Sequence, residues 1–315
     1  MRNVQQTHAQ SSDMPVYLTL AAVTMIWGGT FVAGRFLAGS LSPMFAASLR
    51  FLLASAALLG FLWVARMPLA RPTRRQWLQL TLLGLFGIFF YNLCFFYGLQ
   101  YINASRASLI VALNPALIGL ASWLLFKERL GRLKVLGIAT CIAGASLVIV
   151  SRNPQLLAAT ADAWIGDLLI FGCVVGWGVY SLCSRDLNQT LGPVQTVTYS
   201  ILLGTVMLWA LAAVRGELSW TVLCNLGTPQ WLSLIYLGVF GSALAYIGYY
   251  RGIRQIGATR SGVFIALNPL TAVILGAALL GEQLTPAMCV GGVLILAGIY
   301  LCNKAFAPGV KKRIL

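Results

Sequence analysis

A stretch of this chain that is long enough to cross a lipid bilayer occurs twice. Residues 104–128, ASRASLIVALNPALIGLASWLLFKE, return 154 positions later as ATRSGVFIALNPLTAVILGAALLGE, residues 258–282. Both copies are apolar, carry an arginine near the start, end on a glutamate and hold Leu-Asn-Pro close to the middle. About 20 apolar residues span the hydrocarbon layer as a helix. The repeat therefore predicts two membrane-crossing helices of the same design.

The proline interrupts each of these helices. It has no N–H to donate, so it frees the carbonyl group one turn earlier, on Val111 and on Ile265. In lipid a freed carbonyl must find a partner or face protein or a wet cavity. The amides of Asn114 and Asn268 lie at the same depth, where polar groups are costly and often functional. Two interpretations stay open: a substrate site near the midplane, or a hydrogen bond that stabilises the kink.

Composition places the whole chain in the membrane class. Hydrophobic residues make up 59% of the 315 positions and charged residues 9%, whereas roughly a quarter is charged in soluble proteins. The net charge of +15 does not indicate a nucleic-acid partner, because most basic residues lie in short loops between apolar runs. The partners expected instead are the lipid bilayer and a small-molecule substrate.

The apolar runs predict an all-α integral membrane protein of ten transmembrane helices. The predicted spans are 16–38, 43–65, 76–98, 104–126, 131–150, 164–186, 193–214, 231–250, 259–280 and 286–306. Ser42-Pro43 and Thr285-Pro286 pair a capping residue with a proline at the first helical position, which marks two of the helix starts.

The repeat extends over most of the chain. Gln-Trp-Leu occurs at 76–78 and again at 230–232, and Trp-Gly occurs at 27–28 and again at 177–178. We therefore divide the sequence into a tail, two five-helix repeats and a basic tail. Their bounds are 1–15, 16–150, 164–306 and 307–315. Five is an odd number, so the second repeat must enter the membrane inverted with respect to the first.

Loop charges agree with inverted repeats. Four basic residues lie between 127 and 134, after the fourth span, whereas the matching loop at 281–288 has none. Four arginines lie between 66 and 75, before the third span, whereas Arg215 is alone before the eighth. Since cytoplasmic loops collect Lys and Arg, a multi-pass protein with both termini in the cytoplasm is predicted.

Aromatic and polar residues at repeat-related positions predict one midplane cavity for the substrate. The predicted lining residues are Trp27, Asn92, Phe95, Asn114, Trp177, Tyr180, Tyr246, Tyr249 and Asn268. The two tryptophans lie in mid-span and not at the interface, where lipid-facing tryptophans collect. Buried tyrosine hydroxyls also need partners. Ordinary helix packing is the alternative for the aromatic positions.

Charges at the ends of the duplicated helices predict a gate. A cation at a helix start and an anion at its end both oppose the helix dipole, yet both repeats keep them. The predicted ion pairs are Arg106 with Glu282 outside and Arg260 with Glu128 inside, one of which opens in each access state. Local partners, such as Arg132 for Glu128, are the alternative.

The remaining charges indicate no catalytic machinery. Arg35 and Arg50 lie near the outer ends of their spans, where snorkelling accounts for them; a contact between Arg50 and a substrate carboxylate is the alternative. Each Asp and Glu falls at a span end or in a loop, and the single histidine, His8, is in the N-terminal tail. We expect neither an enzyme nor a metal or other cofactor.

Glycines predict one close helix pair. Gly137 and Gly144 are two turns apart on one helix face, and Gly291 and Gly298 repeat the arrangement. Small residues on one face permit close approach in membranes. The fifth and tenth spans should pack tightly, either with each other or across a homodimer.

These motifs resemble the drug/metabolite transporter superfamily, and within it the EamA-type ten-span exporters. The resemblance rests on Trp-Gly at 27–28, SLRFLLA at 48–54, and the two Leu-Asn-Pro motifs followed by glutamate. It covers nearly all of residues 16–305. It implies a cell inner-membrane carrier that exports amino acids, related metabolites or lipophilic compounds. It also implies a central cavity between two units, worked by alternating access.

Other functions would need features of their own. A carrier of phosphorylated or nucleotide-linked solutes would need cations in its cavity, and the candidate cations lie near span ends. A channel would need rings of similar polar side chains along a pore, and an intramembrane enzyme would need convergent catalytic groups. Coupling to protons or sodium and facilitated diffusion are both open at this stage.

Overall fold

The protein is helical throughout the part of the chain that its structure, a computed structural model, describes. That part comprises residues 13–37, 40–102, 107, 110–127, 131–152, 162–271, 274 and 284–304. The helices of its first half are α1 (Met14–Leu37), α2 (Pro43–Val64), α3 (Arg74–Leu83), η1 (Gly84–Phe90), α4 (Tyr91–Tyr101), α6 (Asn114–Phe126) and α7 (Arg132–Arg152). Those of its second half are α8 (Ala163–Thr190), α9 (Pro193–Val214), α10 (Trp220–Cys224), α11 (Thr228–Ile235), η3 (Tyr236–Leu244), α12 (Ala245–Ile256), α13 (Ala258–Val263), η4 (Phe264–Ala266) and α15 (Pro286–Lys304).

Seven of the described helices are long and apolar enough to cross a membrane. They are Pro43–Val64, Arg74–Gly98, Arg132–Ser151, Ala163–Thr190, Pro193–Val214, Thr228–Ile256 and Pro286–Asn303. Met14–Thr30 and Asn114–Phe126 are shorter apolar helices. The protein is therefore an all-α, multi-pass membrane protein. Parts of the predicted spans 104–126 and 259–280 lie outside the described residues, and the count of ten stays a prediction.

The two predicted helix starts are confirmed. Helix α2 begins at Pro43, and the backbone N–H of Phe45 donates to the Ser42 hydroxyl at 3.2 Å. Helix α15 begins at Pro286, where the N–H of Met288 donates to the Thr285 hydroxyl at 3.3 Å. Each hydroxyl satisfies a donor of the first turn that has no partner within the helix.

Two wide, π-helical segments interrupt long helices at matching positions. Segment η1 lies between α3 and α4, and η3 lies between α11 and α12. Each has, at or near its start, a glycine that lets another helix approach closely. A Cβ atom on Gly84 would lie 2.9 Å from the carbonyl oxygen of Ser200 in α9, and one on Gly238 would lie 2.8 Å from that of Arg50 in α2. Such segments occur frequently at functional sites.

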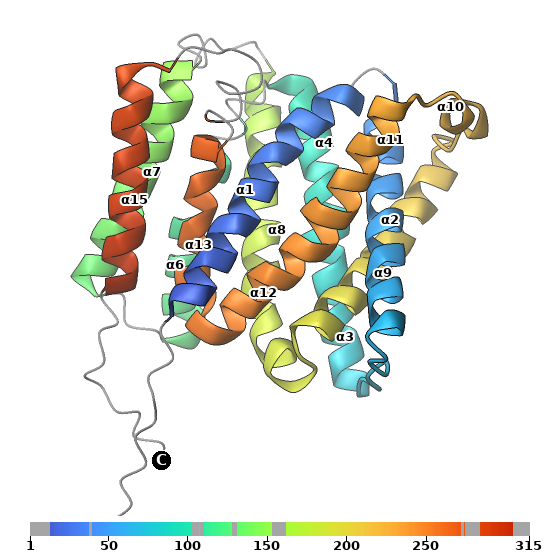
Figure 1. Ribbon diagram of the computed structural model, residues 1–315, viewed down its shortest axis with the longest axis horizontal. Coiled ribbons are helices and arrows are strands. Elements are labelled where there is room, and N and C mark those ends of the chain that lie inside the picture. The colour runs from blue at the N-terminus through green and yellow to red at the C-terminus, as the bar shows by residue number, and fades with distance from the viewer. Residues whose placement is uncertain are drawn as a thin grey trace, which may run out of the picture.

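Figure 1 shows α7 and α15 side by side at one edge of the bundle. A Cβ atom on Gly144 would lie 2.6 Å from the carbonyl oxygen of Gly291, and one on Gly137 would lie 2.7 Å from that of Gly298. The predicted close pair of helices is thereby confirmed within one chain. Helices α6 and α13 lie between this pair and the rest of the bundle (Figure 1).

Candidate functional site

An aromatic cluster occupies the centre of the bundle, where α1, α8 and α12 meet. We use this name for Trp27, Trp177, Tyr180, Tyr246 and Tyr249, which are all buried. The centroid of the Trp177 ring lies 5.3 Å from that of Trp27, 5.4 Å from those of Tyr180 and Tyr249, and 5.5 Å from that of Tyr246. The structure thus brings five of the nine predicted substrate residues into direct contact.

The polar tips of the cluster are satisfied unequally. The indole N–H of Trp27 donates to the Gly241 carbonyl oxygen in η3 at 2.9 Å. The Tyr180 hydroxyl lies 3.1 Å from that of Ser200, and the Tyr249 hydroxyl lies 3.3 Å from that of Ser181. The indole N–H of Trp177 is buried and makes no hydrogen bond of regular geometry. A buried donor left in that state is costly.

The residues predicted on α4 lie at the side of the cluster. Phe95 stacks on Tyr91 with ring centroids 6.1 Å apart, and Tyr91 in turn lies 5.9 Å from Trp177. The amide of Asn92 is buried and donates back to the Ile88 carbonyl of its own helix at 2.6 Å. Phe95 is therefore one ring away from the cluster, and the hydrogen bond of Asn92 is local.

Both Asn-Pro motifs lie at breaks in helical structure. Helix α6 begins at Asn114, after a turn in which the N–H of Leu113 donates to the Ile110 carbonyl at 3.0 Å. The tight η4 segment ends directly before Leu267-Asn268. The Asn114 amide donates to the Val111 carbonyl at 2.9 Å, which is the carbonyl that Pro115 frees. This bond supports the interpretation in which Asn114 stabilises the kink.

That bond uses only one end of the Asn114 side chain. Its carbonyl oxygen Oδ1 is buried with no hydrogen-bond partner, and so is Oδ1 of Asn268. Each repeat-related asparagine thus keeps one buried acceptor unsatisfied. Buried polar atoms are nearly always paired in native proteins, and the exceptions often mark functional positions.

Sequence reasoning gave too little weight to Arg50, which it explained by snorkelling. The Arg50 side chain instead turns into the bundle, where its Nε donates to the Ser242 hydroxyl of η3 at 2.8 Å. Its guanidinium carbon lies 5.1 Å from the centroid of the Phe51 ring. Phe51 is itself 6.4 Å from Tyr246, so Arg50 lies at the edge of the aromatic cluster. The arginine within SLRFLLA was the available signal.

Of the four predicted gating residues, only Arg260 lies within the described part of the chain. Arg106, Glu128 and Glu282 fall outside it, so the two predicted ion pairs stay predictions. Arg260 is buried at the start of α13, and its guanidinium donates to Asp13 Oδ2 and Asn303 Oδ1 at 3.0 and 2.8 Å. It also bonds the Tyr17 hydroxyl. We call Arg260, Asp13, Tyr17 and Asn303 the α13 junction, because they join α1, α13 and α15.

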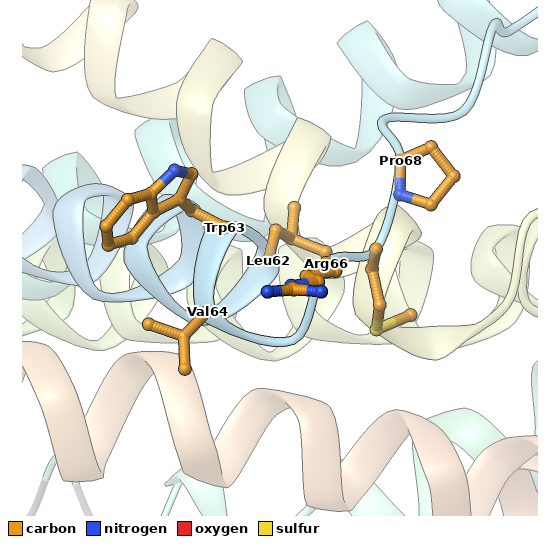
Figure 2. Close-up of a pocket in the computed structure, with 6 residues that line it drawn as sticks. Leu62, Trp63, Val64, Arg66 and Pro68 are labelled. Carbon is orange, nitrogen blue, oxygen red and sulfur yellow. The ribbon is translucent and has the colours of Figure 1, made fainter.

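Two surface hollows lie at the opposite ends of α2. One lies at its last turn and the loop after it, and is lined by Leu62, Trp63, Val64, Arg66, Met67 and Pro68 (Figure 2). The other has a volume of about 250 Å³ and includes Ser42, Met44, Tyr97, Arg215 and Glu217. In the second hollow Glu217 pairs with Arg215 at 3.3 Å and accepts a hydrogen bond from Ser42 at 2.8 Å. Neither hollow contains a predicted substrate residue.

Comparison with known proteins identifies the class of protein that carries this cluster. The sequence model of the EamA-like transporter family matches residues 14–150 and, a second time, residues 164–304. The chain belongs to this family. A relative from Bacillus subtilis (strain 168), named uncharacterized transporter YyaM, is 29% identical over 284 residues, which cover 90% of this chain and 92% of that protein.

Two further similarities bear on substrate and fold. A probable terminal-alkyne amino-acid exporter of Streptantibioticus cattleyicolor is 27% identical over 236 residues, 74% of this chain and 75% of that protein. A solved structure titled "Crystal structure of protein" has a TM-score of 0.78 at 23% identity, over 95% of this chain and all of that one. The second similarity speaks for the fold alone. Because it belongs to the EamA family, this chain is a membrane transporter. The family is one of transporters and not of enzymes.

Proposed function

We propose that this EamA-family protein is a secondary transporter that exports small metabolites, namely amino acids or related compounds, by alternating access. The observation that carries the proposal is the aromatic cluster, which gathers side chains from three helices in the centre of the bundle. Its rings pack on one another, so a substrate enters only when the helices that carry them separate. Large aromatic surfaces with few polar groups are typical of small-molecule sites.

Contacts between matching positions support two inverted five-helix units. The hydroxyls of Ser55 and Thr205, which are 150 positions apart, bond each other at 3.0 Å. Segment η1 of the first half packs on α9 of the second, while η3 of the second half packs on α2 of the first. This exchange is what a two-fold axis between the units would produce. Separation of the units would open the central cluster to one side at a time.

The distribution of charge supports a cell inner-membrane location with both termini in the cytoplasm. Three helix ends lie toward the lower end of the bundle in Figure 1: the start of α3, the start of α13 and the end of α15. The last two meet at the α13 junction. The basic residues Arg74 and Arg132 begin α3 and α7 at that end, and Arg254 lies in the last turn of α12. Such a concentration is typical of the cytoplasmic side.

The choice of substrate class has a separate support. One relative is named as a probable amino-acid exporter, and an amino acid suits a site that combines aromatic walls with a few polar atoms. The unsatisfied Oδ1 atoms of Asn114 and Asn268 provide acceptors for N–H groups. Within this proposal they contact the substrate in at least one access state, which accounts for their lack of partners in the closed cluster.

Transport by purified protein in liposomes tests the proposal. We expect Asn114→Ala and Asn268→Ala to lower the initial rate of amino-acid transport roughly tenfold, since a lost hydrogen bond of 1–1.5 kcal/mol corresponds to about that factor. Reconstituted amounts should stay equal to those of the unmutated protein. Thr140→Ala is the matched control, because its hydroxyl is exposed on α7 and bonds only its own helix.

Two results would count against the proposal. Absence of transport across a panel of amino acids and related metabolites would remove the assigned substrate class. Normal transport by both asparagine variants would move the site away from the Asn-Pro breaks.

A further inference from the structure

Arg50 lies deep in the bundle and is not paired with an acid. Its Nε is bonded to Ser242, whose hydroxyl in turn donates to the Leu237 carbonyl inside η3 at 2.9 Å. The ion pairs within the described part of the chain join Arg215 to Glu217 and Arg260 to Asp13, and none includes Arg50. Arg50 therefore holds a full positive charge beside the aromatic cluster, supported by one neutral hydrogen bond.

The two terminal nitrogens of Arg50 remain available. Within the described part of the chain, only its Nε takes part in a hydrogen bond. The terminal nitrogens do not belong to the fully buried side-chain atoms that lack a hydrogen-bond partner, so they are reachable from outside the packed interior. The Arg50 side chain is accordingly half-buried although it lies inside the fold. The bond from Nε to Ser242 fixes the plane of the guanidinium and leaves its outer edge uncommitted. That edge is the part of the group that binds carboxylates through two parallel hydrogen bonds.

The groups around Arg50 define what could pair with it. The phenols of Tyr91 and Tyr246 are near enough to interact electrostatically with its charge. Both rings contact Trp177, at 5.9 and 5.5 Å between centroids. An anion on the guanidinium would thus have aromatic surface on its other side. A cationic ligand at the same place would meet an uncompensated positive charge in a medium of low dielectric constant, where repulsion is strong.

We propose that Arg50 is the carboxylate-binding residue of the transport site, so that the exported compounds carry a carboxylate joined to an apolar or aromatic body. This inference rests on the proposed function and narrows its substrate class. The guanidinium receives the carboxylate, and Trp177 and Tyr246 cover the body of the solute. Binding compensates the buried charge of Arg50, which is costly without an anion. Lipophilic cations are excluded.

The repeat shows that the arrangement is particular to one half of the chain. The position that matches Arg50 in the second half is Ser200, whose hydroxyl bonds Tyr180. The position that matches Ser242 in the first half is Ile88. A cation and its hydroxyl support therefore occur together in one half and are both absent from the other. Helix packing common to the two halves does not require them.

The first test uses the unmutated protein and compounds that share one aromatic body and differ in whether they carry a carboxylate and an amine. Proteoliposomes are assayed with L-phenylalanine, 3-phenylpropionate, L-phenylalaninamide and phenethylamine, and with the corresponding indole compounds. We expect the two carboxylates of each series to be transported at rates at least tenfold above those of the amide and the amine. Each carboxylate should also compete with transport of the other. Equal transport of the amide or the amine would overturn the inference and leave the proposed function intact.

The second test removes the guanidinium. Arg50→Gln should lower carboxylate transport at least tenfold and reduce the preference for the carboxylate over the amide to near unity. Arg50→Lys keeps the charge without the planar fork and should give an intermediate preference. Arg66→Gln is the control, since Arg66 is an exposed arginine directly after the same helix. A preference that is unchanged in Arg50→Lys and Arg50→Gln would contradict the assignment.

The two kinds of failure are distinguishable. If no compound of either series is transported, the proposed function fails, and the inference fails with it. If transport occurs but does not depend on the carboxylate, only the inference fails. If Arg50→Gln does not fold, the series on the unmutated protein and the Arg50→Lys variant still decide the question.

Discussion

The α7–α15 pair and the aromatic cluster both join the two halves of the chain, but they pack differently. In the α7–α15 pair, glycines bring two backbones together, and the outer faces carry exposed apolar residues such as Leu136 and Val293. In the aromatic cluster, large rings meet at 5.3–6.1 Å, and the indole N–H of Trp177 is left without a regular partner. The pair is a close fit of backbones, whereas the cluster is a contact between side chains that can separate.

This difference indicates different roles. Backbone-to-backbone packing has no rotamers to adjust, so the α7–α15 pair should move as one body. Side-chain contacts can be remade, and unsatisfied polar atoms supply a reason to remake them when a ligand arrives. We expect mutations in the pair to affect assembly, and mutations in the cluster to affect transport more than assembly.

The largest expected effect is on the pair. Gly144→Leu places a side chain where a Cβ atom alone would be 2.6 Å from the Gly291 carbonyl oxygen. We expect it to destabilise the protein by about 1–3 kcal/mol or to prevent assembly, because overpacking forces the backbones apart. Thermal unfolding and size-exclusion chromatography in detergent measure the loss. Gly60→Leu in α2 is the control, since no atom lies within 4 Å of its added Cβ. Equal stability and equal assembly of the two variants would contradict the close backbone packing of α7 on α15.

A smaller effect separates the two tryptophans of the cluster. Trp27→Phe removes the donor of the hydrogen bond to Gly241, and Trp177→Phe removes a donor that has no regular bond. Both lose a similar area of ring, so the difference between them isolates the N–H group. We expect Trp27→Phe to be the less stable variant by roughly 1 kcal/mol. Equilibrium unfolding of the two proteins in one detergent provides the comparison. Equal stabilities would mean that the hydrogen bond from Trp27 to Gly241 does not contribute to the stability of the cluster.

The smallest effect concerns the α13 junction, which ties the central helix α1 to α15 of the pair. Asp13 is half exposed, so its ion pair with the buried Arg260 is accessible to salt. We expect Asp13→Asn to lower stability by about 0–1 kcal/mol, with a loss that shrinks at high ionic strength. Unfolding at low and high salt measures it. Asp186→Asn, at an exposed position of α8, is the control. A loss that is independent of salt would assign the effect to the hydrogen bonds of the junction instead.

The sequence determined the class of the protein by itself. Apolar runs of bilayer length require helices, because backbone groups in lipid must be paired within the segment that carries them. The Ser-Pro and Thr-Pro starts of α2 and α15 followed from local capping chemistry, which needs no tertiary partner. The glycine spacing on α7 and α15 predicted their close contact, because small residues on one helix face have few other uses in a membrane.

Tertiary structure decided which side chains face one another. The sequence predicted a shared place for Trp27, Trp177 and Tyr246, but it also placed Asn92 there, and the Asn92 amide bonds its own helix. Arg50 was read as a snorkelling residue, because its depth along a span is visible in the sequence and its direction is not. Only the approach of η3 to α2 shows that Ser242 receives it. Helical periodicity fixes the face of a residue within its own helix, whereas the choice of neighbour depends on how the helices cross, and no single helix encodes that crossing.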